Sequence, residues 1–212
     1  MQGNLESTSP RFQHQLSCTL HAGTHLFRVH RAYRQAGAFN HSRAPLNRRN
    51  GRFDCEEGDD YPFYYAALTA RTALFETIVT EAAISTPATI PTSAMDKRVL
   101  SIVELTQEIN LISLRTAEDF ASIGSTDWLV RALPKDYPLT RQWSRLLRAK
   151  YSWAQGLIWY SRKDPAEESL VLFGDRCPAD IVRQTSQPSL PLDRIESREW
   201  LAPLLSPHQI EY

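Results

Sequence analysis

Residues 61–78, YPFYYAALTARTALFETI, are the stretch from which the fold prediction starts. The first part, Tyr61 to Ala66, is short and aromatic, which is typical of a strand with Pro62 at its beginning. Thr69 can then cap a helix, because the apolar residues after it recur at spacings of three and four. We therefore predict a strand followed directly by a helix over about 70–84, with Glu76 near its middle. The apolar face of this helix consists of Ala70, Ala73, Leu74, Thr77 and Ile78.

Further strands and helices are predicted on both sides of this unit. Runs rich in β-branched and aromatic residues predict strands, and helical spacing with capping residues predicts helices. The helix that starts at Thr116 has Glu118 and Asp119 in its first turn, where the helix dipole favours negative charge. The predicted strands cover 25–30, 98–105, 108–114, 157–161 and 169–173, the last two as an antiparallel pair, and the helices cover 116–124 and 138–153.

The length and pattern of the chain predict one domain with two tails. The chain has 212 residues, a size that suits a single globular domain. Residues 1–24 are polar and unpatterned, which predicts an N-terminal arm, and the domain is expected over 25–177. Residues 178–212 form a polar, proline-rich C-terminal tail, in which a helix over 195–205 could dock on the domain.

Composition excludes several classes of protein. The chain has 24 Lys and Arg against 24 Asp and Glu, which argues against direct binding of nucleic acid or a membrane surface. Three cysteines without a C-x-x-C pair suggest neither a disulfide framework nor a zinc knuckle, and no apolar run approaches membrane-spanning length. A cytoplasmic protein is expected. No metal site is expected either, because neither cysteine nor carboxylate ligands support His21, His25 and His30.

An arginine-rich segment runs from Arg28, within the first predicted strand, to Arg52, before the second. It contains seven arginines and no Asp or Glu, a bias that suits a phosphate or another anion. The acids that follow at positions 54–60 leave a second interpretation open, a solvated loop whose charges cancel locally. The arginines are Arg28, Arg31, Arg34, Arg43, Arg48, Arg49 and Arg52.

Local sequence leaves the roles of the other candidate residues open. Arg28 lies inside a predicted strand, so its side chain either points to solvent or serves a site. Glu76 lies on a polar stripe of its helix and is either solvated or functional. Tyr64 and Tyr65 point to opposite faces of a strand, so one belongs to the core and the other can stack on a flat ring. Ser161 ends a strand, where serine is most often a turn residue.

Five short segments, in order, resemble the RES family, which is named for its Arg, Glu and Ser. The segments are LFRV (26–29), NGRFD (50–54), YYAA (64–67), TALFE (72–76) and YS (160–161). The family contains the toxins of RES/Xre toxin–antitoxin modules, which degrade NAD+. The resemblance implies an α+β fold like that of the ADP-ribosyltransferase toxins, with mostly antiparallel sheets and flanking helices.

The resemblance also implies roles for six residues. By motif, Arg28, Glu76 and Ser161 correspond to the catalytic residues of the family, and Arg28, Arg52, Tyr65 and Tyr64 to NAD+-binding residues. The chemistry of these residue types agrees with the cleavage of NAD+. Cleavage of the nicotinamide–ribose bond passes through a ribosyl cation, which a carboxylate such as Glu76 can stabilise. Two arginines can hold the pyrophosphate, and a tyrosine can stack on a ring.

The sequence thus predicts an enzyme with NAD+ as substrate and no resident cofactor. We expect an NAD+ glycohydrolase or NAD+ phosphorylase, neutralised by an antitoxin or an immunity protein. Two alternatives remain: transfer of ADP-ribose to a protein target, and a catalytically inactive nucleotide-binding module.

Overall fold

The computed structural model describes residues 16–41, 51–55, 59, 61–79, 88–205 and 210–211. Arg43, Arg48 and Arg49 of the arginine-rich segment lie outside these residues, as do residues 80–84 of the predicted helix.

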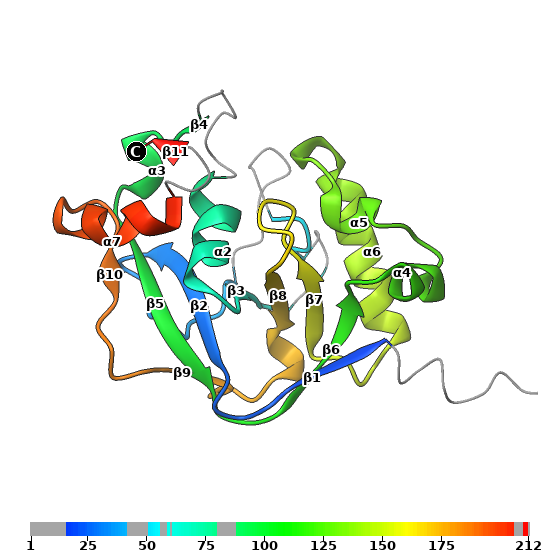
Figure 1. Ribbon diagram of the computed structural model, residues 1–212. Helices are drawn as coiled ribbons and strands as arrows, with labels where there is room; N and C mark the ends of the chain where they lie inside the picture. Colours follow the sequence, from blue (N-terminus) through cyan, green and yellow to red (C-terminus); the bar gives the residue numbers. More distant parts are fainter. Residues whose placement is uncertain are drawn as a thin grey trace, which may run out of the picture.

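The main feature of the described residues is a nine-stranded sheet (Figure 1). Its order is β1-β6-β7-β8-β3-β2-β5-β10, with β9 also pairing with β5. Within this sheet β6 and β7 run parallel, and the other pairs are antiparallel. The strands are β1 (Ser17–Leu20), β2 (His25–Arg31), β3 (Phe63–Ala67), β5 (Arg98–Leu105), β6 (Ile109–Leu114), β7 (Gly156–Tyr160), β8 (Glu168–Phe173), β9 (Val182–Gln184) and β10 (Leu190–Pro191). A small parallel pair joins β4 (Ala88–Thr89) to β11 (Ile210–Glu211).

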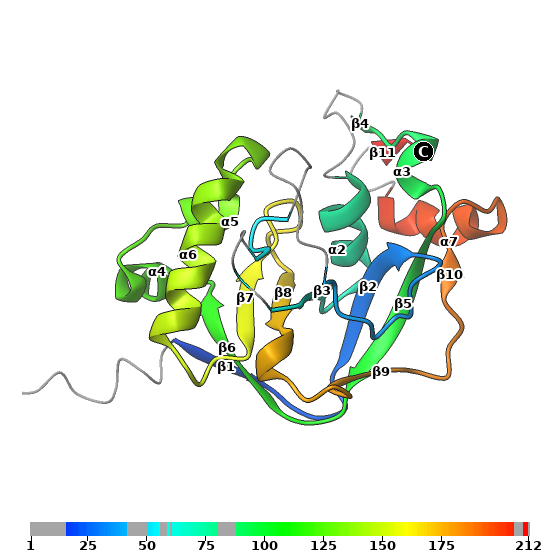
Figure 2. The ribbon, with the colours of Figure 1, turned by 180° about the vertical axis from the view of Figure 1, so that it is seen from behind.

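The helices lie on one side of this sheet. α4, α5 and α6, which lie between β6 and β7 in the chain, pack beside these two strands, whereas α2 stands over the middle of the sheet (Figure 2). The helices are α2 (Ala70–Leu74), α3 (Thr92–Met95), α4 (Ala117–Ile123), α5 (Trp128–Arg131), α6 (Tyr137–Lys150) and α7 (Glu196–Leu205). The π-helical turn η1 (Phe75–Val79) follows α2 directly, and two short 3-10 helices are η2 (Pro134–Asp136) and η3 (Gly174–Arg176).

The sheet divides between β2 and β3. These two strands pair through Phe27 and Ala67, and the two groups of strands diverge from this contact (Figure 1). The helix formed by α2 and η1 lies over the division, because its apolar face packs against Ala67 and against Phe27 and Val29 of β2. A helix that carries a functional side chain is thereby fixed where the two groups of strands separate.

The predicted fold class is confirmed: the protein is α+β, with a mostly antiparallel sheet and flanking helices. The predicted strands correspond to β2, β3, β5, β6, β7 and β8, and β7 pairs antiparallel with β8 as expected. The capping signals hold for α4, where Thr116 and Asp119 form a capping box and Gly124 ends the helix at φ +75°.

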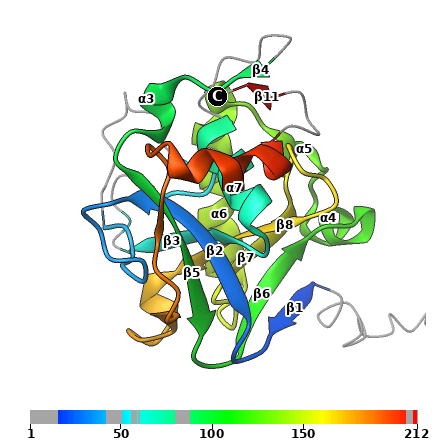
Figure 3. The ribbon, with the colours of Figure 1, turned by 60° about the vertical axis from the view of Figure 1, so that its left-hand side comes forward.

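Both predicted tails contribute to the sheet. In the arm, residues 17–20 form β1 and pair with β6. In the tail, β9 and β10 pair with β5, and α7 lies across α2 (Figure 3). Polar composition concealed these strands, because each is at most four residues long and supplies few buried side chains.

Leu201 of α7 provides a test of this docking. It is fully buried in the cluster that contains Ala73, Phe75 and Ile78, so Leu201→Ala should lower the free energy of unfolding by about 2–5 kcal/mol. Urea denaturation measures the change. Leu146→Ala is the control, since Leu146 is 61% exposed and its loss should cost less than about 0.5 kcal/mol. Equal effects of the two changes would show that α7 does not dock.

Candidate functional site

The ends of two strands bring Glu76 and Ser161 to the same edge of the sheet. Both β3 and β7 run antiparallel to β8, which lies between them. The carboxyl ends of β3 and β7 therefore meet where β8 begins, with Ala67 opposite Ser169 and Tyr160 opposite Glu168. The helix of Glu76 follows β3 after two residues, and Ser161 follows β7 directly.

The two side chains are joined by a hydrogen bond. Ser161 Oγ donates to Glu76 Oε1 at 2.7 Å, although the residues lie 85 positions apart in the sequence. Ser161 Oγ also accepts hydrogen bonds from the backbone N–H groups of Lys163 and Asp164, each at 3.2 Å. A hydroxyl has one proton and two lone pairs, so these contacts direct its proton toward Glu76. Ser161 is buried and Glu76 is partly exposed, which leaves the carboxylate accessible to a ligand.

Glu76 lies in a widened turn. The α-helical hydrogen bonding of α2 gives way to π-helical geometry over Phe75–Val79. Phe75, Ile78 and Val79 of this turn are buried, and Glu76 lies between them in a less buried position. Single π-helical turns inside helices are rare and are often found at functional sites.

Tyr65 fixes the turn that carries Arg52. Its hydroxyl accepts the backbone N–H of Phe53 at 2.8 Å, and Gly51 N–H donates to Asp54 Oδ2 at 2.7 Å. A Cβ on Gly51 would lie 2.4 Å from Asp54 Oδ1 and 2.8 Å from the Tyr65 hydroxyl, so this turn requires glycine. Burial raises the pKa of Asp54 and, together with the Asp54 charge, raises that of Tyr65 well above its usual value.

Arg52 is a buried cation with spare hydrogen-bonding capacity. The residue is 5% exposed, and its Nε has no hydrogen-bond partner. The guanidinium carbon lies 5.6 Å from the ring centroid of Tyr137, at the start of α6. Thr140 of α6 donates to the Arg52 carbonyl at 2.5 Å and so fixes the backbone. Among the described residues no carboxylate pairs with this guanidinium, an arrangement that suits an anionic ligand.

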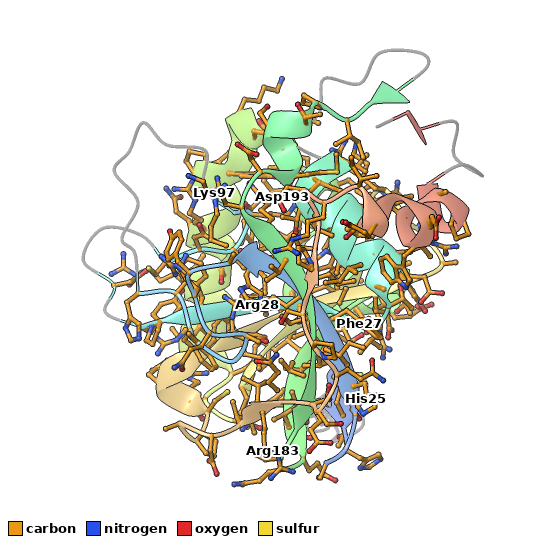
Figure 4. The ribbon with its side chains drawn as sticks, turned by 90° about the vertical axis from the view of Figure 1, so that its left-hand side faces the viewer. His25, Phe27, Arg28, Lys97, Arg183 and Asp193 are labelled. Carbon is orange, nitrogen blue, oxygen red and sulfur yellow. The ribbon has the colours of Figure 1, made fainter. Side chains whose placement is uncertain are left out.

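Arg28 and Tyr64 lie on the other face of the sheet. Side chains alternate along β2, so Arg28 and Phe27 point to opposite sides of the strand (Figure 4). The Phe27 side packs against the cluster that contains α2, whereas Tyr64 belongs to the cluster on the far face. The structure therefore brings Glu76 and Ser161 together but does not bring Arg28 or Tyr64 to them.

Arg28 has internal partners instead of a free guanidinium. Its Nη1 donates to the carbonyls of Ala36 at 2.9 Å and Ala38 at 2.6 Å, and its guanidinium lies 4.1 Å from the centroid of the Tyr64 ring. The Tyr64 hydroxyl donates to the same Ala36 carbonyl at 2.9 Å. Burial lowers the pKa of Arg28. These contacts tie the segment after β2 to the sheet, and Tyr64 is the core member of the tyrosine pair, at 0% exposure.

Sequence reasoning missed Lys163 and Asp164. Lys163 lies beside the site, and burial and the charge of Arg162 lower its pKa while the charge of Glu76 opposes that shift. Asp164 is 3% exposed. One sequence signal could have indicated them: the three charged residues of SRKD (161–164) come directly after the predicted strand that ends at Ser161.

The described residues contain no group of three or more His, Cys, Asp or Glu residues that could hold a metal ion. The helices of the described part include none that is long and apolar enough to cross a membrane.

The chain is similar to known proteins in its fold and in its sequence. A chain of the crystal structure of the M. tuberculosis MbcT-MbcA toxin–antitoxin complex superposes with a TM-score of 0.62 at 15% sequence identity. The match covers 85% of this chain and 90% of that chain, which shows that the two chains share a fold. No curated protein matches the sequence significantly. The family model described as the RES domain matches residues 25–193, which is most of the chain and includes all six candidate residues. The chain therefore belongs to the RES domain family.

Proposed function

We propose that this protein degrades NAD+ by cleaving the bond between nicotinamide and ribose, with water or phosphate as acceptor. The observation that carries the proposal is the hydrogen bond between Ser161 and Glu76, two residues to which the resemblance to the RES family assigns catalytic roles. A partly exposed carboxylate held in one orientation at a sheet edge suits this chemistry.

The carboxylate of Glu76 stabilises the positive charge of the transition state. As the N-glycosidic bond breaks, its electron pair returns to the pyridinium nitrogen, and neutral nicotinamide leaves. The anomeric carbon, which has become cationic, then bonds to an oxygen of water or phosphate, and with water a proton is released to solvent. A fixed carboxylate near the ribose lowers the energy of this cation without reorganising during the reaction. Ser161 orients Glu76 by its single O–H.

Arg52 binds the pyrophosphate of the substrate. Its guanidinium is buried and its Nε is without a partner, and Tyr65 and Thr140 hold the turn around it. Charge-assisted hydrogen bonds from a guanidinium to phosphate oxygens are stronger than neutral ones. The turn of Arg52 packs on Tyr65 and Trp159, and these two side chains lie on the same face of the sheet as α2.

The biological role that follows is that of a toxin with a neutralising partner. The similar solved structure is described as a toxin–antitoxin complex. Loss of NAD+ would be toxic to a cell, so we propose that an antitoxin or an immunity protein binds this chain and blocks the site.

Glu76→Gln tests the role of the carboxylate. The change removes the negative charge and keeps the shape, so we expect nicotinamide release from NAD+ to fall by about 1,000-fold or more. Chromatographic detection of nicotinamide measures the rate, and the melting temperature should change little. Glu108→Gln, on an exposed glutamate that contacts His21, is the matched control and should keep full activity. A fully active Glu76→Gln protein would contradict the mechanism.

Arg52→Gln tests the phosphate contact. A lost charge-assisted hydrogen bond is worth about 1.5–3 kcal/mol, so KM for NAD+ should rise about ten- to hundredfold, with a smaller change in kcat. Steady-state kinetics separate the two quantities. Arg131→Gln, at an exposed arginine paired with Asp127, should leave KM unchanged. An unchanged KM in Arg52→Gln would remove Arg52 from the site.

The acceptor is identified by the products of the wild-type reaction. Hydrolysis gives ADP-ribose and is independent of phosphate, whereas phosphorolysis gives ADP-ribose 1″-phosphate in proportion to the phosphate supplied. Mass spectrometry distinguishes the two products. Rapid transfer of ADP-ribose to proteins of a cell lysate, with little free product, would favour the protein-modifying alternative. NAD+ binding without nicotinamide release would favour the inactive module.

A further inference from the structure

Asp164 connects the loop of Ser161 to the helix of Glu76. The Arg71 side chain donates to both carboxylate oxygens, from Nε to Oδ2 and from Nη2 to Oδ1, each at 2.9 Å. Thr72 Oγ1 donates to Oδ2 at 2.7 Å. The Asp164 side chain thus accepts three hydrogen bonds from two consecutive residues of α2, although it lies more than 90 positions away in the sequence.

The Thr72 hydroxyl is itself oriented by the start of the helix. Thr72 Oγ1 lies 2.7 Å from Thr69 Oγ1, which accepts the Thr72 backbone N–H at 3.3 Å as the helix N-cap. Because the Thr72 proton goes to the carboxylate, Thr69 donates to Thr72. The cap of α2 and the Asp164 carboxylate therefore form one continuous network.

The backbone of Asp164 contacts Ser161 directly. Its N–H donates to Ser161 Oγ at 3.2 Å, and its carbonyl accepts the N–H of Glu167 at 2.9 Å. Ser161 N–H in turn donates to the Glu167 carbonyl at 2.9 Å, which closes the turn. The same residue thus holds α2 with its side chain and Ser161 with its backbone.

Helical geometry relates these contacts to Glu76. Residues four apart lie on the same side of a helix, so Glu76 follows Thr72 by one turn. An Asp164 side chain bound at Thr72 places Ser161 beside the next turn, within reach of the glutamate. Arg71 supplies the compensating charge, and the hydrogen bonds that it donates to Asp164 raise the pKa of the Arg71 guanidinium.

We propose that Asp164 is a positioning residue for the proposed reaction: by binding Arg71 and Thr72 it sets the Ser161–Glu76 hydrogen bond that orients the catalytic carboxylate. Asp164 does not itself contact the substrate. The expected effect on kcat rests on the proposed function. The expected effect on the position of Ser161 rests on the Ser161–Glu76 contact alone.

Asp164→Asn tests the proposal in two arms. The amide replaces one acceptor by a donor that faces Arg71 and Thr72, so the loop should lose its fixed position. In the kinetic arm, we expect kcat for nicotinamide release to fall about tenfold or more, with KM within about twofold. In the structural arm, the crystal structure of the variant should show Ser161 Oγ beyond hydrogen-bond reach of Glu76.

A matched buried aspartate separates positioning from simple stability. Asp119 is 4% exposed and also accepts three hydrogen bonds, from Ser113 Oγ and from the N–H groups of Arg115 and Thr116. Asp119→Asn should lower the melting temperature but leave kcat unchanged. If both variants lost kcat in proportion to their loss of stability, Asp164 would have a structural role only.

A double-mutant cycle tests whether Asp164 acts through Ser161. In the Ser161→Ala background, Asp164→Asn should reduce kcat by less than about twofold, because the contact that it positions is already absent. Multiplicative effects of the two changes would overturn the proposal. If the wild type released no nicotinamide, the proposed function would fail, and the structural arm would still decide: an unchanged Ser161–Glu76 contact in Asp164→Asn would overturn the positioning role.

Discussion

The candidate site depends on one topological constraint, the placement of β8 between β3 and β7. Because both neighbours run antiparallel to β8, their carboxyl ends emerge at the same edge of the sheet. One end continues into the helix of Glu76 and the other into the turn of Ser161. The hydrogen bond between the two side chains closes this edge, and Asp164 fastens the turn to the helix. Residues far apart in the sequence are thereby held in one orientation.

The division of the sheet has a second consequence. Phe27 and Ala67 pair where β2 meets β3, so the face toward α2 carries Phe27 and Tyr65, and the far face carries Arg28 and Tyr64. The arginine and the tyrosine of the far face serve the segment after β2 through three hydrogen bonds to its carbonyls. Arg52, by contrast, lies on the face of the sheet that carries α2.

Sequence reasoning recovered the elements with strong local patterns and missed those without them. The strands β5 to β8 and the capped helix α4 follow from composition and periodicity, and the order of the five short segments identified the RES family. It could not decide which face of β2 Arg28 occupies, because alternation gives relative directions and not the identity of the buried faces. It also could not find Asp164, since its partners Arg71 and Thr72 become neighbours only through tertiary structure.

In the proposed reaction, NAD+ binds on the Glu76 side of the sheet, with its ribose at the carboxylate. A crystal structure with NAD+ bound to the Glu76→Gln protein, which we expect to be inactive, tests this placement. We expect the anomeric carbon of the nicotinamide ribose to lie beside residue 76 and the pyrophosphate to lie at the Arg52 guanidinium. A dinucleotide bound on the far face, at Arg28 and Tyr64, or away from residue 76 altogether, would contradict it.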